Sequence, residues 1–133
     1  MLTLVDSNVV LDYLTEDEEW ADWSAAMLRE AATVGGVAIN QIVFAEVAVK
    51  FGTNEALDAA LPKDYFARLS VPWEAAFAAS KAFAQYRRRG GAKRSPLPDF
   101  FIGAHAAVAG MALLTRDPRR YRAYFPKLKL ICP

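Results

Sequence analysis

Leu2-Thr-Leu-Val5, followed at once by Asp6-Ser7-Asn8, opens the chain with a short apolar strand that ends in polar residues. Two further compact apolar runs, Val37-Ala-Ile39 and Met111-Ala-Leu-Leu114, are expected to be buried strands of similar length. Longer stretches with helical spacing of their apolar residues lie between these runs. This alternation is typical of βαβ units that build a parallel sheet. The sequence therefore predicts an α/β fold.

Further helices and strands are expected around these runs. In chain order they are helices at 9–14, 16–32, 40–51 (beginning at Asn40 or Gln41) and 54–61, a weak strand at 68–71, helices at 72–89 and 98–109, a last helix from 117, and a final strand at 127–131. The helix at 16–32 is expected to carry acids in its first turn, where the helix dipole favours them. We find no internal repeat or linker, and we expect one domain over residues 1–133.

The composition excludes several classes of protein. Of the 133 residues, 54% are hydrophobic and only seven each are Gly and Pro, so the chain is neither disordered nor of low complexity. The single cysteine, Cys132, excludes a disulfide framework and favours a reducing compartment. The N-terminus has no basic segment and no apolar run reaches membrane-spanning length, so we expect a cytoplasmic protein without a signal peptide.

Charge is distributed unevenly along the chain. Residues 1–66 carry a net charge of −9 and residues 67–133 a net charge of +10. Clustered Lys and Arg attract phosphate backbones, so the second half is expected to bind a nucleic acid. The candidate RNA-binding residues are Arg87, Arg88, Arg89, Lys93, Arg94 and Arg116. The alternative is a solvated helix end, whose cations complement the helix dipole. It accounts for the first three arginines but not for the high density of basic residues in this segment.

Two acidic residues, Asp6 and Asp117, directly follow predicted strands or lie close behind them. Either could simply cap the helix that comes next. Sites in open α/β sheets lie at the carboxyl ends of strands, however, and both residues occupy that position. Each remains a candidate catalytic residue.

Glu46 and Asp99 interrupt apolar helical segments. Glu46 lies in Ile42–Val49, which is apolar nearly all round and is expected to be largely buried; a pair with Lys50 on a narrow exposed stripe is the alternative. Asp99 precedes Phe100 and could be a first-turn acid that complements the helix dipole. A buried carboxylate is costly unless it is paired or binds a metal, so both are candidate catalytic residues.

The four acids are expected to converge at one edge of the sheet. Clustered carboxylates repel one another unless a hard divalent cation takes their oxygens, so Mg²⁺, or alternatively Mn²⁺, is the expected cofactor. Such an ion can polarise a phosphodiester and lower the pKa of a bound water. His105, the only histidine, is expected to be a packed or surface residue rather than a catalytic one.

The chain resembles the PIN-domain nucleases, and within them the VapC-type toxins of bacterial type II toxin-antitoxin systems. The resemblance spans essentially the whole chain and rests on Val5-Asp6-Ser7-Asn8, on Glu46 after Asn40-Gln41, on Leu97-Pro-Asp99-Phe-Phe-Ile-Gly-Ala-His-Ala106, and on Leu114-Thr115-Arg116-Asp117 followed by Arg120-Tyr121 and Tyr124-Phe125-Pro126. It implies a three-layer fold with a parallel sheet of about five strands. It also implies Mg²⁺ on Asp6 and Asp99, with Glu46 and Asp117 completing the acidic cluster, and Ser7, Asn8 and Thr115 as supporting polar groups.

The activity implied by the resemblance is metal-dependent endoribonucleolytic cleavage by a homodimer that a cognate antitoxin silences. A catalytically weak PIN-like module that binds RNA or protein is the alternative. Such modules arise when the acidic set is incomplete, and here all four acids are present. The endoribonuclease is therefore the favoured interpretation.

Overall fold

A computed structural model describes residues 1–91 and 97–133. Its strands form one sheet in the order β3-β2-β1-β4-β5, and every neighbouring pair is parallel. The strands are β1 (Thr3–Val5), β2 (Val37–Ile39), β3 (Phe66–Arg68), β4 (Ala112–Leu114) and β5 (Leu130–Ile131). In the centre of the sheet, Leu4 lies beside Ala38 on one side and Leu113 on the other. The predicted parallel α/β sheet is confirmed.

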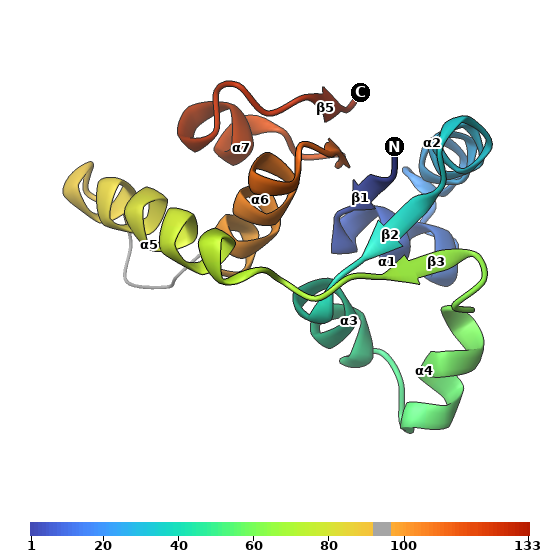
Figure 1. Ribbon diagram of the computed structural model, residues 1–133. Coiled ribbons are helices and arrows are strands. Elements are labelled where there is room, and N and C mark those ends of the chain that lie inside the picture. Colours follow the sequence, from blue (N-terminus) through green and yellow to red (C-terminus); the bar gives the residue numbers. More distant parts are fainter. Residues whose placement is uncertain (92–96) are drawn as a thin grey trace.

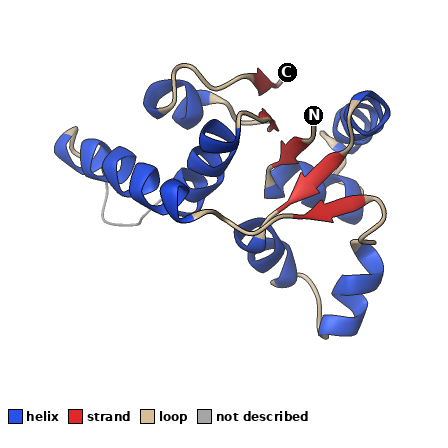
Figure 2. Ribbon diagram, in the orientation of Figure 1, coloured by secondary structure: helices blue, strands red, loops and turns tan. Residues whose placement is uncertain are grey.

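Helices cover both faces of this sheet. They are α1 (Ser7–Thr15), α2 (Ala21–Val34), α3 (Gln41–Ala48), α4 (Asn54–Ala60), α5 (Trp73–Arg88), α6 (Leu97–Ala109) and α7 (Arg119–Tyr124). Figure 1 shows α5 and α6 on one side of the sheet and α1 with α2 on the other. Figure 2, in the same orientation, shows the short red strands between these blue helical layers. The expected three-layer arrangement is confirmed.

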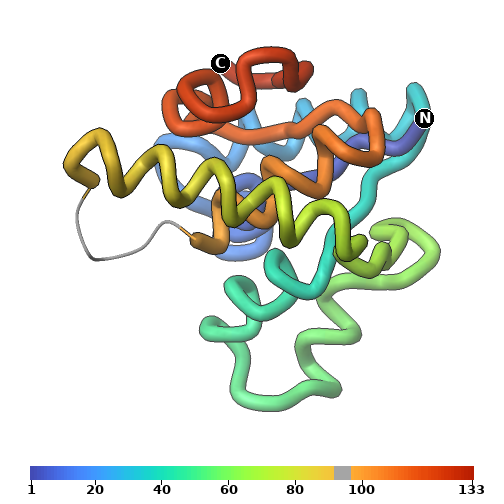
Figure 3. Tube along the Cα trace, turned by 60° about the vertical axis from the view of Figure 1, so that its left-hand side comes forward, coloured from blue at the N-terminus to red at the C-terminus, as the bar shows by residue number. Residues whose placement is uncertain are grey.

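The core follows from the apolar strands. Every residue of β1 and β2 is buried, because strands inside a parallel sheet are covered on both faces. A second apolar cluster joins α5 to α6, which run along each other in Figure 3. Its small residues, Ala75, Ala79 and Ala104, let the two helices approach closely around Phe100. This contact fixes the first turn of α6 against the rest of the fold.

The second helix begins five residues later than expected. Glu16 has a left-handed φ of 53° and its N–H donates to the carbonyl of Asp12, which ends α1. The carboxylate of Asp17 then accepts the N–H groups of Glu19 and Trp20. The acids at 16–19 therefore form a turn, and the prediction that they occupy the first turn of a helix was wrong. Side-chain bonds of this kind compete with the helix for the same N–H groups.

Two other boundaries also differ from the prediction: α3 ends at Ala48 rather than at Phe51, and β3 begins earlier than the expected strand. The third strand was expected at 68–71, but β3 pairs Phe66 with Val37 and Arg68 with Ile39. Pairing with β2 decides this position, because the local pattern at 68–71 is weak.

The described residues contain no helix with the length and apolar composition of a membrane span.

Candidate active site

Polar residues follow three neighbouring strands at one edge of the sheet. Asp6 comes after β1, Asn40 after β2 and Thr115 after β4, and all three are buried. The carboxyl ends of parallel strands meet at the same edge, so the topology gathers these side chains. This edge is where the sequence predicted the site.

The carboxylate of Asp6 is held by four donors. Its Oδ1 accepts the N–H of Ser7 at 2.8 Å, which makes Asp6 the N-cap of α1. Its Oδ2 accepts from Thr115 Oγ1 at 2.8 Å, from Tyr121 Oη at 2.9 Å and from Asn8 Nδ2 at 3.5 Å. The capping interpretation of Asp6 is therefore confirmed, and its role in a functional site stays a prediction. None of these four partners carries a positive charge.

The electrostatic surroundings of Asp6 disfavour its ionised form. Burial, the charge of Asp99 and, to a smaller extent, the charge of Glu46 raise the pKa of Asp6 to about 6. The hydrogen bonds from Thr115 and Tyr121 oppose that shift. Asp6, Asp99 and Glu46 are thus near enough to repel one another, as clustered carboxylates do.

Glu46 faces α1 rather than Lys50. Its Oε1 accepts a hydrogen bond from Ser7 Oγ at 2.8 Å, and burial raises its pKa, with the Ser7 hydrogen bond opposing and the Asp99 charge adding to the shift. The expectation that its helix is largely buried was wrong, because only Val43 and Val47 of α3 are buried. The helix lies at the rim of the fold, and Glu46 is half-buried there.

The start of α3 is fixed by Asn40. Its Oδ1 caps the helix by accepting the N–H of Val43 at 3.0 Å, and its Nδ2 lies 3.0 Å from His105 Nδ1. The amide donates in this pair, so His105 Nδ1 accepts, and burial lowers the pKa of His105, which favours the neutral ring. His105 is a packed histidine, one of the two placements that the sequence suggested, and it orients the helix that carries Glu46.

Asp99 lies in the first turn of α6 and forms an ion pair. Arg120 Nη1 donates to its Oδ2 at 2.6 Å, and the Asp99 side chain is 31% exposed. Burial raises the pKa of Asp99, Arg120 lowers it, and the charge of Asp117 raises it again. Phe100 is fully buried beside it, as the flanking aromatics indicated.

Asp117 lies at the periphery of the cluster. Its side chain is 54% exposed, and its Oδ1 is 3.5 Å from Arg119 Nε. It does not cap α7, because the N-cap position belongs to Pro118 and no side chain caps that helix. The charges of Glu46 and Asp99 therefore act on Asp6, and the charge of Asp99 acts on Glu46, whereas Asp117 is exposed and its charge acts on Asp99.

The donor set fits a hard divalent cation that keeps much of its water. In the described part of the chain, no three acidic, histidine or cysteine side chains lie close enough together to form a closed metal cage. Mg²⁺ is commonly held by only one or two carboxylates, with waters and substrate phosphates completing the shell. Asp6 and Asp99 are the two acids that could form such a pair, and the charge of Asp99 raises the pKa of Asp6, a repulsion that a cation would relieve.

The predicted basic residues divide into three groups. Arg87, Arg88 and Arg89 are exposed at the carboxyl end of α5, whereas Lys93 and Arg94 lie outside the described residues. Arg116 Nε instead donates to the buried Asp12 at 2.7 Å. A role of Arg116 in RNA binding stays a prediction, and its contacts here are internal.

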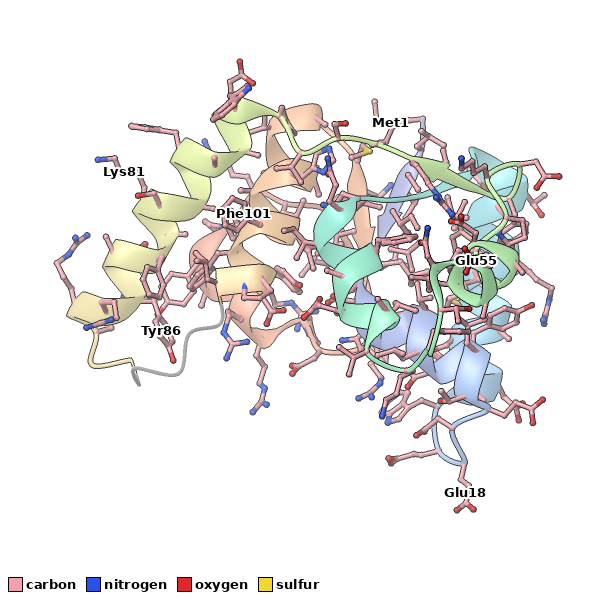
Figure 4. The ribbon with its side chains drawn as sticks, turned by 90° about the horizontal axis from the view of Figure 1, so that it is seen from below. Met1, Glu18, Glu55, Lys81, Tyr86 and Phe101 are labelled. Carbon is pink, nitrogen blue, oxygen red and sulfur yellow. The ribbon has the colours of Figure 1, made fainter. Side chains whose placement is uncertain are left out.

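The exposed arginines of α5 adjoin the candidate site through an aromatic cluster. Arg89 lies over the ring of Tyr124, and Tyr86 packs edge-on against Phe100, the neighbour of Asp99. Figure 4 shows Tyr86 on this end of the molecule and Glu18, in the acidic turn before α2, at the opposite end. The basic end of α5 therefore lies away from the acidic turn before α2.

Tyr121 and Arg120 contact the acids, although the sequence analysis named them only within the resemblance and gave them no role in the site. Tyr121 is buried in α7 and reaches Asp6 because Gly103 leaves room: a Cβ there would lie 3.0 Å from Cδ1 of Tyr121 and 2.7 Å from Cε2 of Phe125. The available signal was Gly103 itself, since a glycine inside an apolar helix often marks a close approach of another element.

Comparison with known proteins agrees with this architecture. The structure is similar to VapBC2 from Rickettsia felis bound to a promoter DNA fragment, with a TM-score of 0.77 and 18% identity over 100% of this chain and 99% of that one. It is also similar to VapBC-1 from nontypeable Haemophilus influenzae, with a TM-score of 0.74 and 16% identity over 99% and 98% of the two chains. A third similar structure is VapBC-5 from Mycobacterium tuberculosis, a member of the VapBC family of toxin-antitoxin systems. Its TM-score is 0.60 and its sequence identity is 22%, over 98% of this chain and 96% of that one.

At these identities the similarities show a shared fold. No curated protein sequence matches the chain significantly. The family model of the PIN domain matches residues 3–126, which include all four candidate acids. The chain belongs to the PIN domain family.

Proposed function

We propose that this protein is a Mg²⁺-dependent endoribonuclease that acts as the VapC-type toxin of a type II toxin-antitoxin system. The observation that carries the proposal is the buried carboxylate of Asp6, whose pKa is raised by burial and by the nearby charges of Asp99 and Glu46. Its four hydrogen-bond donors are all uncharged. A site of this kind has a deficit of positive charge that a divalent cation supplies.

Each residue of the site has its own role in the proposed reaction. Asp6 and Asp99 would hold Mg²⁺, which when bound polarises the phosphodiester and makes a water more acidic. Ser7 orients Glu46 through its 2.8 Å hydrogen bond, and the raised pKa of Glu46 suits it to accept a proton from the attacking water. Thr115 and Tyr121 keep Asp6 in one orientation, so that its oxygens are pre-positioned.

Removal of divalent metal is expected to abolish cleavage. The purified protein should cut RNA with Mg²⁺ or Mn²⁺ and lose all cleavage in EDTA, because the carboxylates alone cannot polarise a phosphate. Excess Mg²⁺ added after the chelator should restore the activity. Full cleavage in EDTA, measured on the same end-labelled RNA, would contradict a metal-dependent mechanism.

The carboxyl end of α5 is expected to contact the RNA backbone. A double variant, Arg87→Gln with Arg88→Gln, should weaken RNA binding and reduce the slope of log affinity against log salt by about 1 to 1.5, because single-strand phosphate contacts set that slope. The matched control is Arg29→Gln with Lys63→Gln, which removes two exposed cations from the acidic half of the chain. If both double variants show the wild-type slope, the RNA path lies elsewhere.

A cognate antitoxin is the proposed protein partner. The similar structures from Rickettsia felis and Haemophilus influenzae are VapBC assemblies, and the Mycobacterium tuberculosis structure is named as a member of a toxin-antitoxin family. A small antitoxin-like reading frame beside the gene would support this partner. The homodimeric state stays a prediction.

Sequencing of RNA 5′ ends after brief expression tests the whole proposal. Cells that express the wild-type protein should accumulate new ends at discrete positions within minutes, and cells that express Asp99→Asn should not. The positions would also identify the RNA class. Identical end profiles for the two proteins would leave the alternative, a PIN-like module that binds without cutting.

A further inference from the structure

The short helix α7 delivers consecutive side chains to the two carboxylates assigned to the metal. Tyr121 donates to Asp6 Oδ2 at 2.9 Å, and Arg120 donates to Asp99 Oδ2 at 2.6 Å. The first donor is neutral and the second is a cation. Among the ion pairs of the described residues, Asp99 is the only member of the Asp6, Glu46 and Asp99 cluster that has a partner.

This ion pair is accessible enough to open. The side chains of Arg120 and Asp99 are 38% and 31% exposed, so water can replace the contact on either partner. A pair at this level of exposure is held weakly, since solvent screens the attraction and two side chains must be kept ordered. By contrast, only 3% of the surface of Asp6 is exposed, so water cannot readily replace its hydrogen-bond partners.

A guanidinium and a divalent cation on Asp99 disfavour each other. Arg120 contacts only Oδ2 of Asp99, but a cation bound to the same carboxylate would lie a few ångströms from the guanidinium, and the two positive charges repel each other at such distances. Tyr121 presents no conflict of this kind, because a hydroxyl group can keep its hydrogen bond to Asp6 while another oxygen lone pair faces an ion.

We propose that Arg120 is an internal competitor for the metal: its guanidinium neutralises the charge of Asp99 and thereby opposes the binding of a divalent cation to that carboxylate. This inference rests on the metal site of the proposed function. It makes Arg120 a positioning residue that acts through Asp99, and it sets the divalent-cation concentration at which the site fills.

The chain offers a closely matched control in the preceding residue. Arg119 belongs to the same helix and carries the same charge, but its side chain is 89% exposed and lies 3.5 Å from Asp117. A general effect of one positive charge on α7 would appear in variants of both arginines. Direct competition on Asp99 would appear only in variants of Arg120.

The test is the affinity for Mn²⁺, measured by electron paramagnetic resonance on the full-length protein without RNA. Arg120→Gln should bind Mn²⁺ about three- to tenfold more tightly than the wild type, because it removes the competing cation. Arg119→Gln should stay within about twofold of the wild type, since an exposed charge acts weakly. Arg120→Lys, which keeps the charge but loses the planar fork, should fall between the wild type and Arg120→Gln.

The other possible results of these measurements refute either the competition alone or the metal site as well. If Asp99→Asn loses Mn²⁺ binding but Arg120→Gln shows unchanged or weaker affinity, the competition is refuted and the metal site survives. If the wild type binds no Mn²⁺, or if Asp99→Asn binds it as well as the wild type, the metal site fails and the competition fails with it. A thermal melt accompanies each variant, and unfolding of both Arg120 variants would show that the pair is structural, which also refutes the proposal.

Discussion

Single substitution of Asp6→Asn, Glu46→Gln or Asp99→Asn is expected to lower the rate of RNA cleavage by about three orders of magnitude or more, because the residues that hold and use the ion act as one unit. Each amide retains the shape of the side chain but removes a negative charge from the cluster. The three variants should remain folded, since their charges repel one another in the metal-free protein. The measurement is single-turnover cleavage of an end-labelled RNA in Mg²⁺.

Asp117→Asn is the comparison that the structure supplies. Its side chain is exposed and pairs loosely with Arg119, so we expect a rate loss well below that of the other three. Wild-type cleavage by Asp6→Asn or Asp99→Asn would refute the site assignment. A rate loss for Asp117→Asn as large as that for Asp99→Asn would show that Asp117 takes a direct part in catalysis.

In the absence of metal, Asp6→Asn should be more stable than the wild type near pH 7.5. The folded-state pKa of Asp6 is raised from 3.8 to about 6, so the folded protein binds this proton more tightly than the unfolded chain. The stability that results is fully present below pH 3.8 and is lost as the pH rises through 6. At one pKa unit per about 1.4 kcal/mol, the gain on substitution approaches about 3 kcal/mol at most.

Urea unfolding in EDTA at several pH values measures this effect. The advantage of Asp6→Asn should shrink as the pH falls from 7.5 towards 4.5, and excess Mg²⁺ should reverse it by stabilising the wild type alone. Tyr121→Phe should behave in the opposite way, losing more stability at high pH, because it removes a donor to the ionised Asp6. A stability difference for Asp6→Asn that does not vary with pH would contradict the raised pKa.

Much of the candidate site could be predicted from the sequence, because its acids interrupt local patterns. Asp6 ends an apolar strand, and Asp99 precedes a buried aromatic residue in an apolar helix. Such interruptions are visible in a window of a few residues, and the βαβ alternation places strand ends at one edge of the sheet. Asp117 interrupts a pattern in the same way, and the structure leaves it exposed.

What could not be predicted depends on contacts between distant residues. The Thr115 hydroxyl that holds Asp6 is 109 positions away in the chain, and the Arg120 that pairs with Asp99 is 21 positions away. The late start of α2 was also not predicted; here the cause is local, because the Asp17 carboxylate accepts the N–H groups of Glu19 and Trp20 and holds this segment in a turn. Glu46 faces Ser7 instead of Lys50 because α3 packs against α1.

By itself, then, the sequence determined the parallel α/β fold and three of the acids that meet at its edge, because hydrophobic periodicity and strand endings are local properties. The partner of each acid was decided only by the tertiary structure. Asp6 receives neutral donors, Glu46 receives Ser7, and Asp99 receives a cation. These assignments depend on how α1, α3 and α7 pack around the sheet, since contacts across 21 to 115 positions leave no trace in a local pattern.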